Sequence, residues 1–436
     1  MNTLLHSLLA LLVMAGAASA QLQIIRQGQE STGTAQLLDR LGEAVATGDF
    51  NGDGFGDLAS GVPGKLTVSV FRTGAVVVSR GTKWGIGWNS AAMLTPFDGG
   101  HLTDPAIPYR FGSALAAGDF NGDGYDDLAV GASDSTVQRV FIFQGSPSGL
   151  LPVPAVWKAA DYSVSSSGTD EFGAALAAGR LDGDSYEDLV IGSPGRSGGT
   201  GAVFVLRGSA AGLVLPAAGG VITPKSFTFS LSSGCRFGAA LAIGNVGGFN
   251  FGDVLAGAPL HDAGSVADVG AVVLIPGADG GSGLAAGAAL PFFYSDVLTP
   301  RAGARLGTAI TIGDFRGDGG HLDFAASAVF GSADEADATF VWRGLIIPAF
   351  ERIIDSPLPS ANVAQFGSAL AAGDLDGDGR DELIVSAPDA TGSTPALTKE
   401  GVVYAFNGGP SGPFPTPGTV LRESRYESAP EAGLEC

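Results

Sequence analysis

The chain has 436 residues, 69 of them glycine, with only 15% charged residues and a formal net charge of −21. Glycine and proline separate apolar runs at regular intervals, which indicates turns between strands and excludes a disordered low-complexity chain. Binding nucleic acid requires a basic surface, and the sequence has no basic cluster, so we expect no nucleic-acid partner.

Residues 1–20 have the pattern of a cleaved export signal. An apolar run from Leu4 to Met14 ends in small residues, with Ala18-Ser19-Ala20 as an A-x-A cleavage site. The run is shorter than the about 20 apolar residues of a spanning helix, and no second run of this kind follows. We therefore expect no membrane span and a secreted or extracytoplasmic protein, located in the periplasm or at the cell surface.

Two cysteines, Cys235 and Cys436, follow the export signal. In an oxidising compartment they can form a disulfide or stay as two free thiols, and the sequence does not choose between these states. Cys436 ends a polar tail that we assign to residues 422–436. Residues 21–40 form the lead-in at the other end of the mature chain.

One unit recurs six times between residues 41 and 421. Each copy opens with an aromatic residue or leucine followed by glycine, and successive copies begin about 60 to 70 residues apart. The six openings are Leu41-Gly42, Phe111-Gly112, Phe172-Gly173, Phe237-Gly238, Leu306-Gly307 and Phe366-Gly367. A single repeat architecture therefore fills the mature chain.

Each unit contains the pattern of four short strands. A strand of small residues, such as 368–373, leads into an acidic loop, and a second strand follows, such as 382–388. A third begins at Gly-Ala or Gly-Val, as in 201–206, and a variable fourth segment such as 153–157 closes the unit. The pattern predicts an all-β protein with one β-propeller of six four-stranded blades. A pair of β-sandwiches is the rival architecture, but it does not explain six equal units.

The Phe-Gly opening, the Gly-Asp-Phe-Asn-Gly-Asp-Gly loop and exits such as Ser193-Pro194 and Ala387-Pro388 resemble the FG-GAP repeats of integrin α-subunit β-propellers and their bacterial relatives. The resemblance covers residues 40 to 410. It implies a propeller, calcium in the acidic loops and binding of a macromolecule. The animal propeller has seven blades, so seven is the alternative blade count, although no interval here is long enough for a seventh.

Two segments have the pattern of an outer strand that could complete the last blade. Leu22-Gln23-Ile24-Ile25 precedes the first unit, and Thr419-Val420-Leu421 follows the sixth. Closure matters because an unpaired strand edge invites aggregation. We favour the N-terminal strand as the closing strand.

The acidic loop is complete in the first, second and sixth units. Oxygen-bearing side chains occupy its first, third, fifth and ninth positions, and the seventh residue offers its backbone carbonyl. The five positions are Asp49, Asn51, Asp53, Phe55 and Asp57 in the first loop, Asp119, Asn121, Asp123, Tyr125 and Asp127 in the second, and Asp374, Asp376, Asp378, Arg380 and Glu382 in the sixth. Such an oxygen cage suits calcium, which accepts six to eight oxygen ligands.

The other three loops are incomplete. Arg180 replaces the first acid of the third loop, where its guanidinium can take the place of a cation beside Asp182, Asp184 and Asp188. The fourth loop, 245–253, has lost nearly all its ligands. The fifth has Arg316 at the third position and one additional residue. We expect no ion in these three loops.

The alternative is that all six loops are metal-free hairpin turns, since Asn-Gly and Asp-Gly favour such turns without any ion. We favour calcium in the three complete loops because converging carboxylates repel one another unless a cation lies among them. The expected affinity is modest, about 10⁻⁴ to 10⁻³ M, as in extracellular modules. The ions would stabilise the blades and take no part in a reaction.

Other signals are weaker. Arg316-Gly317-Asp318 matches a tripeptide that integrins recognise, but it lies within the fifth loop, so we interpret it as coincidence. Three histidines, His101, His261 and His321, lie outside any catalytic motif. Among the tryptophans, we expect packing roles for Trp157 and Trp342 and a place on the rim for Trp84 and Trp88.

Two functions remain open. We favour a non-catalytic, calcium-binding propeller that binds a protein or polysaccharide at a cell surface or in a matrix, as the resemblance implies. The alternative is an extracellular hydrolase or lyase that uses a propeller face as its active site. The sequence does not specify the oligomeric state.

Overall fold

The structure is a computed structural model. It describes residues 11–12, 23–24, 39–68, 71–83, 85–87, 92–100, 109–134, 138–247, 251–278, 283–319, 321–330, 337–344, 349–355, 365–388, 402–410, 412–413, 417 and 419–422. Most of the expected export signal and the tail after Arg422 therefore lie outside the described residues. Within the described part, no helix has the length and apolar character needed to cross a membrane.

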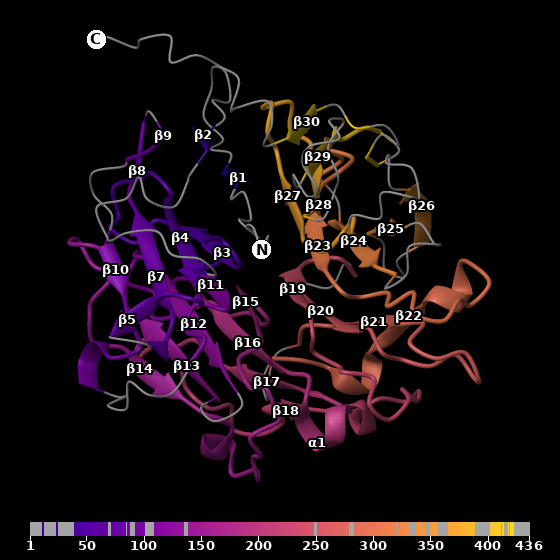
Figure 1. Cartoon of the computed structure of the whole chain (residues 1–436), viewed down its shortest axis with the longest axis horizontal. Coiled ribbons are helices and arrows are strands. Elements are labelled where there is room, and N and C mark those ends of the chain that lie inside the picture. The colour runs from indigo at the N-terminus through magenta and orange to yellow at the C-terminus, as the bar shows by residue number, and fades with distance from the viewer. Residues whose placement is uncertain are drawn as a thin grey trace, which may run out of the picture.

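Six four-stranded antiparallel sheets follow one another around a ring (Figure 1). Blade 1 consists of β3 (Val45–Gly48), β4 (Asp57–Val62), β7 (Ala75–Ser79) and β10 (Ala92–Leu94). Blade 2 consists of β11 (Ala114–Gly118), β12 (Asp127–Ser133), β13 (Gln138–Phe143) and β14 (Ala155–Trp157). Blade 3 consists of β15 (Ala175–Gly179), β16 (Asp188–Ser193), β17 (Ala202–Leu206) and β18 (Val221–Ile222).

The other three blades have the same order. Blade 4 consists of β19 (Leu241–Gly244), β20 (Asp253–Ala258), β21 (Ala271–Ile275) and β22 (Leu290–Phe293). Blade 5 consists of β23 (Ile310–Gly313), β24 (Asp323–Ala328), β25 (Ala338–Arg343) and β26 (Ala349–Asp355). Blade 6 consists of β27 (Leu370–Gly373), β28 (Glu382–Ala387), β29 (Val402–Phe406) and β30 (Thr419–Arg422). The predicted six-bladed all-β propeller is confirmed.

Shorter elements lie outside the blades. Two-stranded pairs join β1 (Leu11–Leu12) to β2 (Gln23–Ile24), β5 (Leu66–Val68) to β6 (Phe71–Arg72) and β8 (Gly81–Thr82) to β9 (Gly85–Ile86). The helical elements are one-turn segments at Asp98–Gly100, Ala159–Tyr162, Arg196–Gly199 (α1), Pro224–Ser226, Ala286–Ala288 and Tyr294–Asp296.

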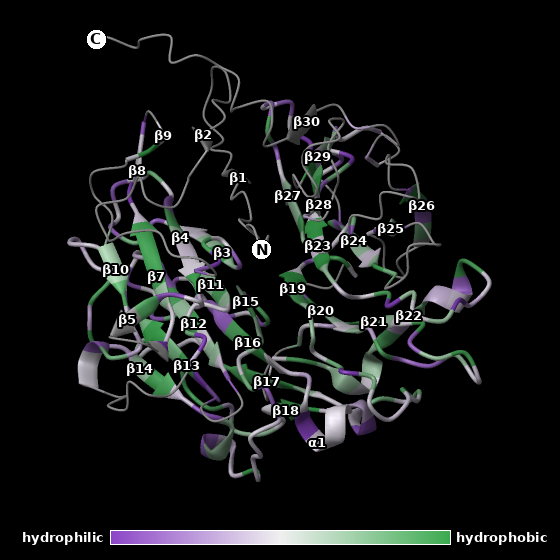
Figure 2. Ribbon diagram, in the orientation of Figure 1, coloured by the Kyte–Doolittle hydropathy of each residue, from purple (hydrophilic) through white to green (hydrophobic). Residues whose placement is uncertain are grey.

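Residue size determines the place of each strand. The first strand of each blade lies nearest the ring centre in Figure 1, and its alanines and glycines allow neighbouring blades to approach closely. The second and third strands are almost fully buried, as in β16 and β17. Figure 2 shows hydrophobic residues on the inner strands as well as on the middle strands, as expected for strands that neighbouring blades cover.

The Phe-Gly openings form the contact between adjacent blades. Phe111 is fully buried, and its ring packs edge-on against Phe141 and Phe143, with ring centroids 5.3 and 6.1 Å apart. The residue before each opening has a left-handed backbone, as at Arg110 with φ 52°. The glycine of each opening also has a positive φ, 88° at Gly112, and residues with a side chain rarely adopt this backbone conformation. The Phe-Gly dipeptide is therefore a fixed turn that places an apolar ring between two sheets.

The prediction about ring closure is wrong. The fourth strand of blade 6 is β30 at the C-terminal end, which pairs with β29 through contacts such as Tyr404 with Val420. The favoured N-terminal strand contributes β2, which pairs with β1 (Leu11 with Ile24). Each blade is thus built from one continuous stretch of the chain, because the segment after β29 is long enough to turn back and pair locally.

The described cysteine is a free thiol. Cys235 is fully buried, and its Sγ lies 3.2 Å from the carbonyl oxygen of Thr200. Burial raises the pKa of this thiol to about 11, which keeps it protonated at neutral pH. Cys436 lies outside the described residues.

Candidate metal centres

The six acidic loops connect the first strand to the second strand of each blade. In blade 2 the loop lies between Gly118 at the end of β11 and Asp127 at the start of β12. The Phe-Gly openings lie at the other end of the first strands. All six loops therefore gather on one side of the ring, and all six openings on the opposite side.

The complete loops fold by the same set of hydrogen bonds from side chain to backbone. In the second loop, Asp119 accepts from the amides of Gly122 (2.7 Å) and Gly124 (2.9 Å). The third-position oxygen of Asn121 accepts from the amide of Asp123 (2.8 Å), and Asp123 accepts from the amide of Tyr125 (3.0 Å). These bonds turn the carboxyl and amide groups inward, toward the centre of the loop.

The first and sixth loops repeat these bonds. Asp49 accepts from Gly54 (2.8 Å), Asn51 from Asp53 (2.9 Å) and Asp53 from Phe55 (2.9 Å). Asp374 accepts from Gly377 (2.7 Å), Asp376 from Asp378 (3.1 Å) and Asp378 from Arg380 (2.9 Å). The sequence pattern therefore specifies one loop conformation in three separate blades.

The ninth-position carboxylate has a structural role in all six blades. One of its oxygens accepts from the amide of the glycine that follows the third strand. The pairs are Asp57 with Gly81 (2.7 Å), Asp127 with Gly145 (2.9 Å), Asp188 with Gly208 (2.9 Å), Asp253 with Gly277 (3.2 Å), Asp323 with Gly344 (2.8 Å) and Glu382 with Gly408 (3.2 Å). This bond explains why the fourth loop keeps Asp253 after losing its other acids.

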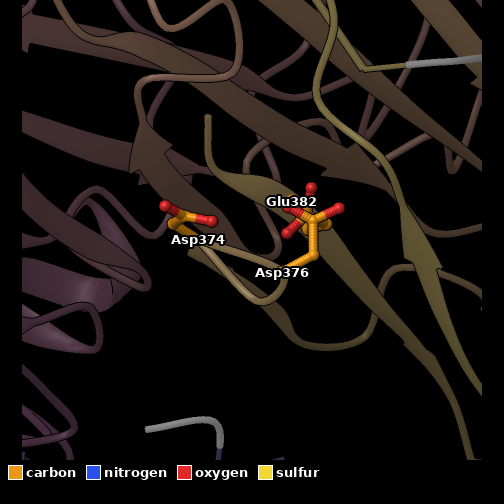
Figure 3. Close-up of side chains that lie close together, drawn as sticks. All are labelled: Asp374, Asp376 and Glu382. Atoms are coloured by element: carbon orange, nitrogen blue, oxygen red, sulfur yellow. The ribbon is translucent and has the colours of Figure 1, made fainter. Parts of the chain in front are cut away.

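The sixth loop brings three carboxylates together. Oxygens of Asp374, Asp376 and Glu382 all lie within 4.8 Å of one another. Figure 3 shows these side chains on the hairpin between β27 and β28, with Asp376 and Glu382 adjacent and Asp374 to one side. A set of anionic oxygens at this spacing has the chemistry that calcium requires.

In the first and second loops an amide group lies between the acids. Asn51 Nδ2 lies 3.3 Å from Asp57 Oδ2, and Asn121 Nδ2 donates to Asp123 at 3.0 Å. The positive end of the amide dipole thus lies where the carboxylates converge. The side-chain oxygen of Asn is a common calcium ligand, and in these loops it accepts from the backbone amide of Asp53 or Asp123.

Burial disfavours the charged form of the ninth-position acids. The pKa of Asp127 is raised to about 7, first by burial and then by repulsion from Asp123 and Asp119. Burial likewise raises the pKa of Asp57 and Glu382. A cation among these oxygens would offset both effects, since an adjacent positive charge favours ionised carboxylates.

In the third loop a guanidinium does take the place of a cation, but it is not that of Arg180. Arg180 is exposed, and its carbonyl accepts from the amide of Gly252 (2.9 Å). Arg207, which follows β17, pairs with Asp182, with Asp184 (3.3 Å) and with Asp188 (3.2 Å). The sequence pattern did not identify Arg207 as the partner of these acids, because the residue lies about 20 positions after the loop and reaches it only across the sheet.

In the fifth loop Arg316 fills the cage of its own loop. Its guanidinium pairs with Asp323 (2.7 Å) and Asp318 (2.6 Å), and the side chain is buried. The buried Arg316 is therefore engaged within the loop, whereas Gly317 and Asp318 of the same tripeptide are exposed. In the fourth loop the amides of Val246 (3.0 Å) and Gly247 (2.7 Å) donate to Asp253 and replace a cation.

A second set of loop residues, at the eighth position, joins neighbouring blades. The amide of Asp126 donates to the carbonyl of Asp49 (3.1 Å), and the Asp126 carboxylate accepts from the amide of Asp49 (2.8 Å). Asp381 and Asp314 form the same reciprocal pair at 2.9 and 2.7 Å. The predicted oxygen cage does not use the eighth position, although an acid stands there in the second, third and sixth loops.

The described histidines and tryptophans include no catalytic arrangement. His261 is buried, its Nδ1 accepts from the amide of Ser232 (3.0 Å), and burial lowers its pKa. Trp342 is buried and stacks on Phe324 with ring centroids 4.8 Å apart, which confirms its packing role. Trp157 is half-buried on β14. His101, Trp84 and Trp88 lie outside the described residues.

Comparison with known proteins identifies the repeat. The FG-GAP repeat family matches residues 41–79, 111–145, 172–206 and 366–406. The phosphatidylinositol-glycan-specific phospholipase D of Rattus norvegicus is 37% identical over 174 residues, which are 37% of this chain and 19% of that protein. Integrin alpha-PS2 of Drosophila melanogaster is 33% identical over 218 residues, 44% of this chain and 14% of that protein.

These relatives are much longer than the matched region. Integrin alpha-IIb of Mus musculus, 33% identical over 171 residues, is matched over 37% of this chain and 16% of its own length. A solved structure of the rhamnogalacturonan lyase YesW overlaps 79% of this chain and 70% of its own, at 14% identity and a TM-score of 0.35. That similarity is too low to bear on the function of this chain.

Proposed function

Because the chain is an FG-GAP repeat propeller similar to that of integrin α subunits, we propose that it is a secreted, calcium-stabilised, non-catalytic module that binds a protein or polysaccharide at a cell surface or in a matrix. The observation that carries the calcium assignment is the convergence of the Asp374, Asp376 and Glu382 carboxylates within 4.8 Å. The first and second loops share the same donor positions and the same internal hydrogen bonds.

Calcium in this proposal has a structural role. Each complete loop is the hairpin between the first and second strands, and its ninth residue also bonds to the end of the third strand. An ion bound there would join three strands of one blade and stabilise the folded state, to which it binds selectively. The Asp49, Asp119 and Asp374 carboxylates are the first ligands that such an ion would need.

The opposite side of the ring offers a surface for a partner. A depression of about 590 Å³ lies over blades 2 and 3 and includes Arg110, Glu171 and Arg236. Arg110 pairs with Glu43 (2.7 Å), and the Arg110 side chain is exposed whereas that of Glu43 is half-buried. Positively and negatively charged side chains at such a surface can leave their ion pair with each other and form ion pairs with a polar partner instead.

Two measurements test this function. Adding calcium over about 10⁻⁴ to 10⁻² M should raise the melting temperature, measured by thermal unfolding, and magnesium should have a smaller effect. Binding to an array of extracellular proteins and polysaccharides should be lost in the Arg110→Glu, Arg236→Glu double variant and kept in Arg343→Glu, which changes an exposed arginine elsewhere. A melting temperature that does not respond to calcium would refute the calcium assignment.

One of the similar proteins is a phospholipase D, which is an enzyme by name, and this similarity favours the alternative that the chain is a hydrolase or lyase. A catalytic function would require an activity that is lost when His101 or His321 is substituted. Binding that survives both substitutions, in a chain without hydrolase or lyase activity on the bound partner, would favour the non-catalytic proposal.

A further inference from the structure

The junction between blade 6 and blade 1 differs from the other five. At each of those five, the amide of the eighth loop residue donates to the carbonyl of the first loop residue in the preceding blade, as Glu187 does to Asp119 (3.1 Å) and Leu322 to Asn245 (2.9 Å). The corresponding bond from Gly56 to Asp374 is missing from the described backbone hydrogen bonds, although both residues are described. The ring therefore has a seam at this junction.

The apolar clusters show the same seam. Five clusters each combine residues of two neighbouring blades, whereas the sixth contains only blade 1 residues, including Leu41, Leu58 and Val77. The second loop residue is fully buried by the next blade in five loops, namely Phe50, Phe120, Leu181, Val246 and Phe315. Its counterpart in blade 6, Leu375, is only half-buried.

Two identical stretches of sequence make the clearest comparison. Residues 111–119 and 366–374 have the same sequence, FGSALAAGD. Ala116 is buried, with 7% of its surface exposed, whereas its counterpart Ala371 is exposed. A Cβ added at Gly118 would meet Glu187 and Ala178 of blade 3, whereas one added at Gly373 would meet no described atom within 4 Å. Since the residues are the same, the difference comes from their surroundings, because the described residues of blade 1 do not cover blade 6 as blade 3 covers blade 2.

The opposite wall of the seam, on blade 1, is apolar. Val45 on β3 is 45% exposed, and Phe55 is 38% exposed. At the closed junctions the seventh loop residue covers the preceding blade, as Tyr125 does at Gly52 and Tyr186 at Gly122. Phe55 has the same loop position, but Gly377 of blade 6 has no described atom within 4 Å of a Cβ built on it. Apolar side chains on one wall thus face small residues on the other.

We propose that residues 21–38 of this chain occupy the seam and cover its two walls. The chain enters blade 1 at Asp39, which is buried and paired with Lys65 (3.3 Å), and Leu41 belongs to the cluster that faces the seam. The preceding segment is therefore tethered at the edge of the seam, which gives it a high local concentration there. Its 18 residues can extend to about 60 Å, several times the length of a blade strand.

The sequence of this segment suits the site. Its large apolar residues are Leu22, Ile24, Ile25, Leu37 and Leu38, and Leu22 and Ile24 alternate with the polar Gln21 and Gln23, as expected for a strand with one covered face. The described strand β2 (Gln23–Ile24) pairs with β1, which lies in the expected export signal. Removal of that signal would free this edge of β2 for a strand of the propeller.

Thiol labelling tests the proposal with a matched pair of positions. Ala371→Cys reports on the seam, and Ala116→Cys reports on the same residue in the same sequence at a closed junction, both in a Cys436→Ser background. The buried Cys235 is the internal slow-reacting thiol. Each variant is then combined with Ile24→Asp, which places a charge on the covered face of the segment, or with Gln23→Asp, which places it on the opposite face.

The proposal expects slow labelling of the Ala371→Cys variant when the segment is unchanged, an increase of about tenfold or more with Ile24→Asp, and no change with Gln23→Asp. The Ala116→Cys variant should be labelled slowly in every combination, which also shows that the blades remain folded. Rapid labelling of the Ala371→Cys variant with an unchanged segment would overturn the proposal. Slow labelling of the Ala371→Cys variant that Ile24→Asp does not accelerate would also overturn the proposal. Slow labelling that depends on protein concentration would overturn it too and would indicate a second copy of the chain in the seam.

Discussion

The loops of blade 2 and blade 5 share one position in the fold but reach electrostatic balance by different means. In blade 2, the side-chain amide of Asn121 donates to Asp123, and burial and repulsion from Asp123 and Asp119 raise the pKa of Asp127 to about 7. In blade 5, Arg316 lies against Asp318 and Asp323 in the corresponding centre. Under the proposed function, the loop of blade 2 would take a cation from solution, whereas the loop of blade 5 contains the guanidinium of Arg316.

The difference shows which part of the loop is structural. In both blades the first-position acid accepts amides from within the loop, as Asp119 does from Gly124 (2.9 Å) and Asp314 from Gly319 (3.2 Å). In both, the ninth-position acid bonds to the glycine after the third strand. These bonds join protein groups to one another in both blades, so they hold the loop whether its centre contains an arginine or not.

The largest effect should come from removing the internal cation of blade 5. Arg316→Ala leaves the buried Asp323 without its partner and should lower the free energy of unfolding by about 3–5 kcal/mol, with or without calcium. Chemical denaturation measures this loss. The control is Arg343→Ala, an exposed arginine of the same blade, which should change stability by less than about 1 kcal/mol. Equal effects of the two substitutions would contradict the role of Arg316.

The next largest effect should come from removing one calcium ligand. Asp119→Asn should abolish the part of calcium stabilisation that depends on the second loop, about 2–3 kcal/mol at calcium 100-fold above the dissociation constant. Asp314→Asn is the matched control, because it alters the same position in the arginine-filled loop of blade 5. Both variants should lose stability without calcium, but only Asp119→Asn should reduce the response to calcium.

The pH dependence of stability should distinguish a buried acid in a calcium loop, Asp127, from a buried acid outside the loops, Asp337. The pKa of Asp127 is about 7 and that of Asp337 about 6, both raised mainly by burial, so each carboxyl keeps a proton in the folded state that the unfolded chain has released. Stability linked to these groups is present below about pH 4 and is lost as the pH rises through the folded pKa. Without calcium, the melting temperature should therefore fall from about pH 5 to pH 7.5.

Saturating calcium should remove the contribution of Asp127, because the bound ion favours its ionised form. It should leave that of Asp337, which lies away from the loops and accepts from the amides of Phe330 (2.7 Å) and Phe366 (2.9 Å). Melting curves at both pH values, with calcium or with a chelator, measure the two contributions. The same pH dependence in both solutions would contradict the assignment of Asp127 as a ligand.

The smallest effect should come from converting an arginine-filled loop into a calcium loop. Arg180→Asp with Arg207→Asn restores the first acid of the third loop and removes the guanidinium beside Asp182, Asp184 and Asp188. The variant should gain a weak calcium response of about 1 kcal/mol, because Ser185 still replaces the turn glycine. Arg180→Asp alone should gain none, since Arg207 would still occupy the loop.

The sequence predicted the blades and the complete loops because both are local patterns. Each loop lies within nine consecutive residues, such as Asp119 to Asp127, and each blade within one repeat. The roles of Arg207 and Asp126 depend on contacts across a sheet or between blades, which spacing along the chain does not reveal. The ring closure was predicted wrongly for the same reason, since Leu22–Ile25 and Thr419–Leu421 both have the pattern of an outer strand.

The most direct test of the account is the number of calcium ions bound per chain, measured by equilibrium dialysis at about 10 mM free calcium, well above the expected dissociation constants. We predict three ions in the parent chain and two in each of Asp49→Asn, Asp119→Asn and Asp374→Asn, with three retained in Asp314→Asn. Binding of no specific ion, or a loss of one ion in Asp314→Asn as well, would contradict the division between calcium loops and arginine-filled loops.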